Sequence, residues 1–331
     1  MRATSGLAPG VRETAAAARS AAVRLAGHVR ETPLWHSPRF SARTGANVWF
    51  KLENLQHTGS FKVRGAFNRL LALEPAQRAA GAVAASSGNH GAAVARALEG
   101  LGMHGVVFVP ENASPVKVAA IRAAGCEVRH FGADGLETEL HARAYAEHRG
   151  MVYVSPYNDP EVVAGQGTCG VEIVRQLPGT DAVFIAVGGG GLAAGTGSVL
   201  KDARREIAVI GCQPEQSAVM HASLAAGGIV QVPGRPTLSD GTAGGIEPGA
   251  ITFDLCRDVV DEWVLVGEAA IAAAMRDFMD TEHQLLEGAA GVALAAFLQR
   301  AADYAGRNVV VLICGANISR DTLATILQAS A

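Results

Sequence analysis

Residues 58–66 (TGSFKVRGA) place Lys62 directly after an aromatic residue, Phe61, in a turn flanked by Gly and Ser. Such a turn fixes the position of the amine, and the ring limits the water that would hydrate its charge. A partly desolvated lysine loses proton affinity and can act as a nucleophile or a base. Most lysines are solvated, so this segment alone fits an ordinary lysine better.

A glycine run, Gly188-Gly189-Gly190-Gly191-Leu192, lies between an apolar strand-like segment (182–187) and a helix-like segment (192–203). Glycines let successive N–H groups converge on one anion, and the helix adds its positive end. The run equally suits a tight turn with close helix packing. A dinucleotide site requires an acidic residue after the next strand, where this chain has Gln213, so the dinucleotide interpretation is weak.

A third segment, Ser86-Ser87-Gly88-Asn89-His90, lies between a predicted strand (82–85) and a predicted helix (91–101). Its hydroxyl and N–H groups could hold a carboxylate at the start of the helix. Ser and Asn are also common helix caps, and in isolation the segment favours that interpretation.

Together these three segments resemble the threonine/serine dehydratase family of pyridoxal-phosphate enzymes, which has fold type II. The resemblance extends from residues 32–34 (TPL) through 51–54 (KLEN) to 314–317 (CGAN). It implies an α/β fold of two parallel-sheet, three-layer domains with a cofactor cleft between them. Residues 1–54 and 156–331 would form the large cofactor-binding domain, and residues 55–155 the small substrate-clamping domain.

The resemblance also assigns roles at the cofactor, pyridoxal 5′-phosphate. Lys62, beside Phe61, would bond the cofactor and act as the base, and Asn89 would contact the ring 3-hydroxyl. The loop 188–192 would hold the phosphate, and Cys314 would face the ring nitrogen as a neutral partner. Glu287 would lie near the cofactor, although it could equally cap the helix that follows it.

For the substrate, the resemblance implies that Ser86, Ser87, Gly88, Asn89 and His90 bind the carboxylate. Ser87, across the ring from Lys62, could protonate the opposite face of the substrate. The family often has Gln two residues after the His, where this chain has Ala92, so the far side of the pocket is open in size and polarity.

We expect no metal. Relatives that bind a divalent cation use two acids after the strand that ends here at Cys212, and Gln213 and Val219 stand in their places. Glu215 alone is a poor site, because a hard cation wants several oxygen ligands.

The expected reaction is β-elimination from a β-hydroxy-α-amino acid such as L-threonine or L-serine, giving a 2-oxo acid and ammonia. The alternatives within pyridoxal chemistry are a racemase and a dehydratase for an unusual substrate, such as threo-3-hydroxyaspartate, phenylserine or a hydroxyectoine-derived acid. An NAD-dependent oxidoreductase and a non-catalytic amino-acid-binding protein are the alternatives from other classes. Because the chain ends soon after residue 317, it resembles the short, catabolic-type members.

Composition limits which classes of partner and which cellular compartment we expect for the protein. The 331 residues are 49% hydrophobic with a formal charge of −3, which argues against nucleic acid as a partner. Five scattered cysteines without a CxxC pair argue against a disulfide framework and a zinc site. We expect a cytoplasmic protein without a membrane segment, and a homodimer by analogy with the family.

The apolar pattern predicts alternating strands and helices, which is typical of parallel sheets with helices on their faces. The expected strands are 48–52, 82–85, 105–110, 127–131, 151–154, 182–187, 207–212 and 308–313. The expected helices are 13–27, 91–101, 115–124, 136–149, 161–176, 192–203, 267–281 and 288–302. Residues 226–249 are expected to form a loop that could shape the site.

Overall fold

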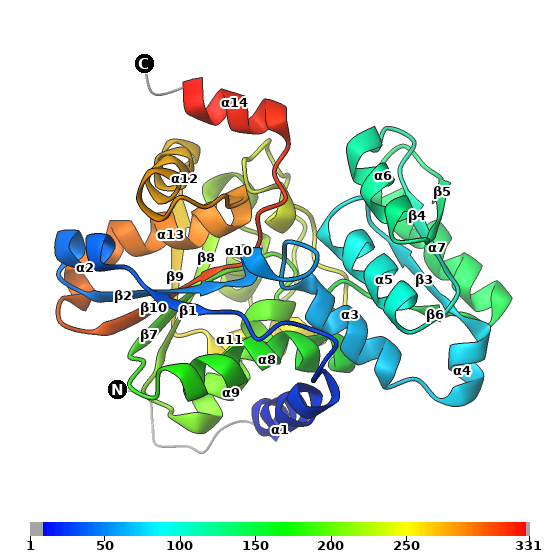
Figure 1. Cartoon of the computed structure of the whole chain (residues 1–331), viewed down its shortest axis with the longest axis horizontal. Coiled ribbons are helices and arrows are strands. Elements are labelled where there is room, and N and C mark those ends of the chain that lie inside the picture. Colours follow the sequence, from blue (N-terminus) through cyan, green and yellow to red (C-terminus); the bar gives the residue numbers. More distant parts are fainter. Residues whose placement is uncertain (1–8, 329–331) are drawn as a thin grey trace.

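The computed structural model describes residues 9–328, whose strands form two separate sheets (Figure 1). The larger sheet has the order β1 (Leu34–His36), β2 (Asn47–Leu52), β10 (Asn308–Ile313), β7 (Ala182–Ala186), β8 (Ala208–Pro214), β9 (Glu262–Val266). The smaller has the order β5 (Glu127–His130), β4 (Gly105–Val109), β3 (Ala82–Ala85), β6 (Val152–Tyr153). Neighbouring strands run parallel except β1, which is antiparallel to β2.

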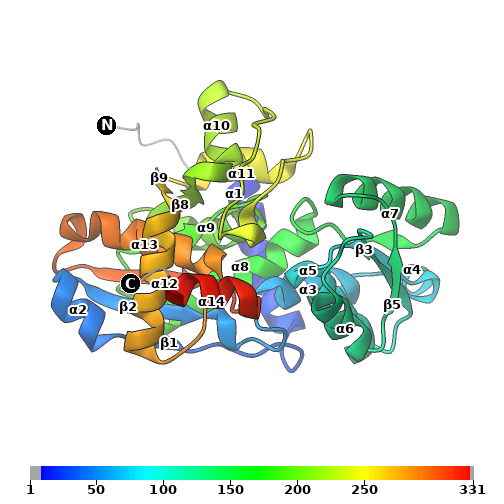
Figure 2. The same cartoon turned by 90° about the horizontal axis from the view of Figure 1, so that it is seen from above.

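Helices cover both faces of the larger sheet (Figures 1 and 2). One face carries α12 (Glu268–Glu282) and α13 (Gly288–Arg300), and the other carries α1 (Pro9–Arg24), α8 (Pro160–Gln176), α9 (Gly191–Ala203) and α11 (Ile251–Val259). The central strand β10 contains the apolar run 309–313, all of it buried. A continuous apolar run is what a parallel strand covered on both faces requires.

The smaller sheet is also a middle layer. On one face lie α5 (Asn89–Gly100) and α6 (Pro115–Ala123), with α3 (Lys62–Leu71) packed against α5, and α7 (Gly135–Arg149) covers the other. Successive side chains of β3 alternate accordingly: Ala82 and Ala84 join the core under α5, and Val83 joins the core under α7. The expected fold of two parallel-sheet, three-layer units is confirmed.

Shorter elements complete the chain. They are the helices α2 (Pro38–Thr44), α4 (Pro75–Ala80), α10 (Val219–Ala226) and α14 (Arg320–Gln328), and the 3-10 turns Glu53–Leu55, Glu215–Ser217, Asp240–Thr242 and Ala301–Tyr304. All five cysteines are buried and free. Within residues 9–328, no helix is both long and apolar enough to cross a membrane.

The predicted strands and helices are present, with ends shifted by up to four residues, and several elements were missed. The first helix runs over residues 9–24 in place of 13–27, and α5 begins two residues earlier than expected. The helix α3 was read as part of a turn, because Gly65 in its second turn weakens the helical signal. The edge strand β1 was missed because it has only three residues, and β9 (EWVLV) because it does not alternate between polar and apolar residues. The division into domains at residues 54 and 155 stays a prediction.

Candidate active site

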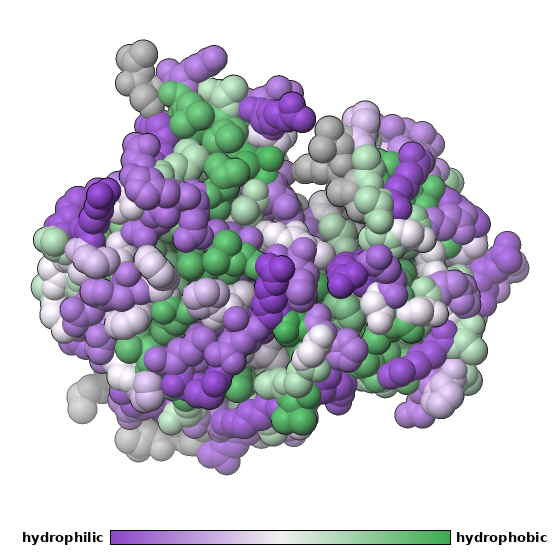
Figure 3. Space-filling model, viewed as in Figure 1, coloured by the Kyte–Doolittle hydropathy of each residue, from purple (hydrophilic) through white to green (hydrophobic). Residues whose placement is uncertain are grey.

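The candidate site is a cavity of about 1120 Å³ at the carboxyl ends of parallel strands from both sheets. Loops after β2, β3, β7 and β10 converge there, as expected for open α/β sheets. The outline of the molecule is indented between the two sheet-containing parts (Figure 3). The cavity brings together every site residue that the sequence predicted: Phe61, Lys62, Ser86, Ser87, Gly88, Asn89, His90, Gly188, Gly189, Gly190, Gly191, Leu192, Glu287 and Cys314.

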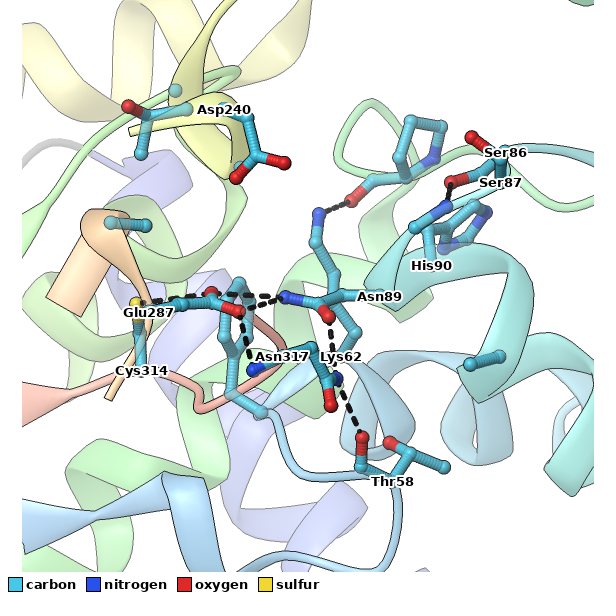
Figure 4. Close-up of a pocket in the computed structure, with 18 of the residues that line it drawn as sticks. Thr58, Lys62, Ser86, Ser87, Asn89, His90, Asp240, Glu287, Cys314 and Asn317 are labelled. Atoms are coloured by element: carbon cyan, nitrogen blue, oxygen red, sulfur yellow. Dashed lines mark hydrogen bonds between the residues drawn. The ribbon is translucent and has the colours of Figure 1, made fainter. Parts of the chain in front are cut away.

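Lys62 is the first residue of α3, and its amine faces the cavity (Figure 4). The Nζ atom donates to the carbonyl oxygen of Pro156 at 2.8 Å and lies 5.3 Å from the centre of the Phe61 ring. Burial lowers the pKa of this amine to about 8, although interactions with Cys314 and Glu287 partly oppose the shift. The positive end of α3 disfavours the charge further. The result is an amine that is partly neutral near neutral pH.

The glycine loop is both an anion cradle and a packing device. Gly190 has φ 89°, and α9 begins immediately after it. A Cβ on Gly189 would lie 2.3 Å from the ring of Tyr157, and one on Gly190 would lie 2.8 Å from Met220 Cε. Glycine is therefore required for packing as well. The first N–H groups of α9 have no carbonyl partner one turn earlier, which suits this loop to a phosphate.

The Ser86–His90 segment is half loop and half helix, because Asn89 and His90 belong to the first turn of α5. Ser86 Oγ accepts from the N–H of Gly88 at 3.1 Å. The buried His90 ring contacts the Val154 carbonyl oxygen at 2.8 Å. Burial and the charge of Lys62 lower the pKa of His90 to about 3, so its ring is neutral and Nε2 is the donor. Gly88 occupies the cap position, and no side chain caps α5 there.

Glu287 does not cap its helix. It occupies the cap position of α13, but its buried side chain makes no capping hydrogen bond. Its carboxylate instead accepts from Asn89 Nδ2, 2.9 Å from each oxygen, and from the backbone N–H of Asn317 at 3.2 Å. The side chain therefore does not cap α13 through a hydrogen bond, and its carboxylate lines the cavity.

Cys314 ends β10 and faces the same carboxylate, with Sγ 3.9 Å from Glu287 Oε1. Burial raises the pKa of this thiol well above its ordinary value, so it stays protonated and neutral. Its carbonyl oxygen accepts from the N–H of Phe61 at 3.1 Å. This bond ties the lysine segment to the end of the central strand.

Several further residues line the cavity without having been predicted, among them Thr58, Pro156, Tyr157, Asp240 and Asn317. Asn317 carried a signal, because it stands just past the carboxyl end of an apolar strand, three residues after Cys314. Asp240 lies in the stretch 226–249, so part of that loop does shape the site. Pro156 and Tyr157 contribute a carbonyl oxygen and a ring, for which the sequence offers no distinctive pattern.

Gln213, which stands where an acidic cation ligand would be needed, has another use. The side chain of Gln213 is buried, donates to the Val187 carbonyl oxygen at 3.0 Å and accepts from the His221 N–H at 2.8 Å. Across residues 9–328, no three His, Cys, Asp or Glu side chains gather in a way that could hold a metal ion.

Comparison with known proteins agrees with this geometry. A family model described as pyridoxal-phosphate dependent enzyme matches residues 25–315. An L-threonine ammonia-lyase of Geobacter sulfurreducens is 41% identical over 306 residues, covering 92% of this chain and 76% of the relative. A catabolic L-threonine dehydratase of Escherichia coli is 38% identical over 305 residues, covering 92% of each chain.

Two solved structures are similar over nearly the whole fold. The processed form of threonine deaminase isoform 2 from Solanum lycopersicum has a TM-score of 0.93 and 33% identity, covering 100% of this chain and 96% of that one. Maize serine racemase has a TM-score of 0.88 and 30% identity, covering 95% and 96%. The chain therefore belongs to the pyridoxal-phosphate dependent enzymes of fold type II, within the threonine/serine dehydratase family.

Proposed function

We propose that this protein is a pyridoxal-phosphate-dependent ammonia-lyase that converts L-threonine or L-serine to a 2-oxo acid and ammonia. The observation that carries the proposal is the Lys62 amine, whose lowered pKa of about 8 makes it a usable base in the same cavity as an anion-binding glycine loop. An NAD-dependent enzyme or an amino-acid-binding protein would not need this lysine.

Pyridoxal phosphate fits the donors that line the cavity. The loop 188–192 and the N-terminus of α9 would hold its phosphate. Asn89 would offer its amide to the ring oxygen, and the neutral Cys314 thiol would suit a ring nitrogen without a proton. When bound, the cofactor draws electron density away from the α-carbon of the amino acid.

The protein's own groups would bind the substrate and move its protons. Ser86, Ser87 and the first-turn N–H groups of α5 form a site for the substrate carboxylate. The neutral Lys62 amine accepts the α-proton and then supplies a proton to the departing β-hydroxyl, which leaves as water. Ala92, which lines the cavity, is smaller than the Gln that relatives often carry there, so bulkier β-hydroxy amino acids are substrates to compare.

The test is release of 2-oxo acid by the purified protein with pyridoxal phosphate. L-threonine, L-serine, threo-3-hydroxyaspartate and phenylserine are compared, and we expect turnover of one of the first two. A visible absorbance band from a cofactor attached at Lys62, located by borohydride reduction and peptide mapping, separates this proposal from a nicotinamide enzyme. A label on Lys51 or Lys201, or no 2-oxo acid from any of the four compounds, would refute it.

Racemisation is a second candidate, favoured by the Ser87 hydroxyl in the same cavity as Lys62. Structures of serine racemases and of an aspartate racemase are 30% to 31% identical to this chain. The test is chiral chromatography of L-serine after incubation. Ser87→Ala should suppress formation of D-serine while 2-oxo acid is still released. An unchanged rate of D-serine formation would show that Ser87 does not protonate the substrate during racemisation.

We also infer that the protein acts as a cytoplasmic homodimer with no nucleic-acid partner. The support is the family resemblance and a formal charge of −3. Light scattering of the purified protein should give twice the mass of the chain, and a monomer would contradict the inference.

A further inference from the structure

A chain of hydrogen bonds crosses the cavity between groups from both sheet-containing parts (Figure 4). Asn317 Nδ2 donates to the Thr58 carbonyl oxygen at 2.9 Å and to Asn89 Oδ1 at 2.6 Å. Asn89 Nδ2 in turn donates to both oxygens of Glu287, each at 2.9 Å. Asn89 comes from α5 on the smaller sheet, whereas Glu287 and Asn317 follow elements of the larger part.

The groups at the two ends of this series of hydrogen bonds fix which atom donates and which accepts in every bond between them. A backbone carbonyl oxygen can only accept hydrogen bonds, and both side-chain oxygens of Glu287 accept from Asn89 Nδ2. The amide group that faces each of them must therefore be NH₂, for Asn317 at Thr58 and for Asn89 at Glu287. Turning either amide over would set two acceptors against each other, so each amide has one orientation.

Glycines make the room that this arrangement needs. Gly59 has φ 68°, and a Cβ there would lie 2.8 Å from Asn317 Oδ1. A Cβ on Gly315 would lie 2.7 Å from the Glu287 carboxylate. The backbone on both sides of the chain of bonds is thus shaped around these polar side chains.

One N–H of Asn89 is left for a ligand. Both oxygens of a single carboxylate lie on the same side of Nδ2, whereas the two N–H bonds of an amide diverge by roughly 120°. Glu287 therefore takes one N–H, shared between its oxygens. The other remains available to an oxygen of a molecule in the cavity.

We propose that Asn317 is a positioning residue, which holds the Asn89 amide so that an N–H, and not the carbonyl, faces the ring oxygen of the bound cofactor. This inference rests on the cofactor site of the proposed function. An N–H donor stabilises the deprotonated form of the ring oxygen, whereas a carbonyl would repel it. Without Asn317, the Asn89 carbonyl loses its donor, and only the bonds to Glu287 still orient the amide.

The first test is a double-mutant cycle on the affinity of the apoprotein for pyridoxal phosphate. Asn317→Ala should weaken binding roughly three- to tenfold, the usual effect of one misdirected hydrogen bond. In an Asn89→Ala background, the same change should add less than about twofold, because Asn317 acts through Asn89. Asn308→Ala is the matched control, since its amide also bonds a carbonyl, at the far end of β10, at 2.9 Å.

The second test follows the ionisation of the bound cofactor by absorbance as pH is varied. Asn317→Ala and Asn89→Ala should each shift the titration of the ring oxygen to higher pH, and Asn308→Ala should not. Equal losses of affinity in both backgrounds, or an unshifted titration in Asn317→Ala, would overturn the inference. Cofactor binding by the parent protein without release of 2-oxo acid would instead defeat the proposed function and leave this inference standing.

Discussion

The first turn of α3 carries two basic residues in opposite environments. Lys62 faces the cavity, and Arg64, two residues later, points away from it into the core, because two residues turn a helix by about 200°. The Lys62 amine donates to a neutral carbonyl oxygen, that of Pro156. The Arg64 guanidinium bonds two carboxylates, those of Glu53 at 2.7 Å and Glu172 at 2.6 Å.

Burial acts on both residues, and the partners decide the outcome. For Lys62, burial dominates and lowers the pKa to about 8. For Arg64, burial alone would lower the pKa, but the carboxylates of Glu53 and Glu172 outweigh it and raise the pKa well above its ordinary value. Lys51 joins the same cluster through Glu172. One side of the turn thus holds a reactive amine, and the other holds a fixed charge that anchors the helix.

The largest expected effect, on the rate of the reaction, comes from removing the Lys62 amine. Lys62→Ala should lower the rate of 2-oxo acid release by at least about 10³-fold, because the base and the cofactor's attachment are lost together. Lys62→Arg is the control, since it keeps a positive charge that cannot be deprotonated at working pH. Substantial turnover by either variant would show that another group is the base.

Removing the Arg64 guanidinium, which anchors the helix, should lower the free energy of unfolding. Arg64→Met leaves the carboxylate of Glu53 buried without its main partner, which costs about 3–5 kcal/mol of unfolding free energy. Urea denaturation of the apoprotein measures it. Arg257→Met is the matched control, because Arg257 pairs with Asp254 at an exposed site and such pairs contribute about 0–1 kcal/mol. Equal losses of unfolding free energy in Arg64→Met and Arg257→Met would show that Arg64 anchors its helix no more strongly than an exposed ion pair does.

The titration of Lys62 sharpens the comparison. In the apoprotein, labelling of Lys62 by an amine reagent should rise with pH and level off above a midpoint of about 8, because only the neutral amine reacts. Glu287→Gln should move the midpoint lower still, since the Glu287 charge raises this pKa. The measurement is mass spectrometry of the labelled peptide. A midpoint near about 10.4, the value of an ordinary lysine, would contradict the desolvation argument.

The smallest effect is a gain in stability. Because its folded pKa lies below its unfolded value, charged Lys62 opposes folding at pH 7, and this cost disappears as pH rises from about 8 toward about 10.4. Lys62→Met should therefore raise the melting temperature of the apoprotein at pH 7 by about 2–4 °C. The gain should shrink at pH 10.5, and a gain independent of pH would point to packing alone.

Much of the fold followed from pattern. Apolar runs such as residues 309–313 are long enough to identify buried parallel strands, and Gly-rich turns after them identify the edge at which a site forms. Elements with a mixed pattern were missed, as α3 and β9 show. Residues 86–90 were placed wholly before their helix, although Asn89 and His90 are within it, because helix starts are marked only weakly by residue type.

The sequence by itself determined which segments supply the chemistry, since a lysine beside an aromatic residue, a glycine run and a Ser-Ser-Gly-Asn-His segment each have a composition that few other roles require. It left Glu287 undecided between a helix cap and the cavity, because both uses need the same residue type at the same position. Only the tertiary structure decided that its carboxylate turns to Asn89, and that Asn317 and Pro156 complete the site. The physical reason is distance along the chain: these bonds join residues that are 30 to 198 positions apart and that only the folded chain brings together.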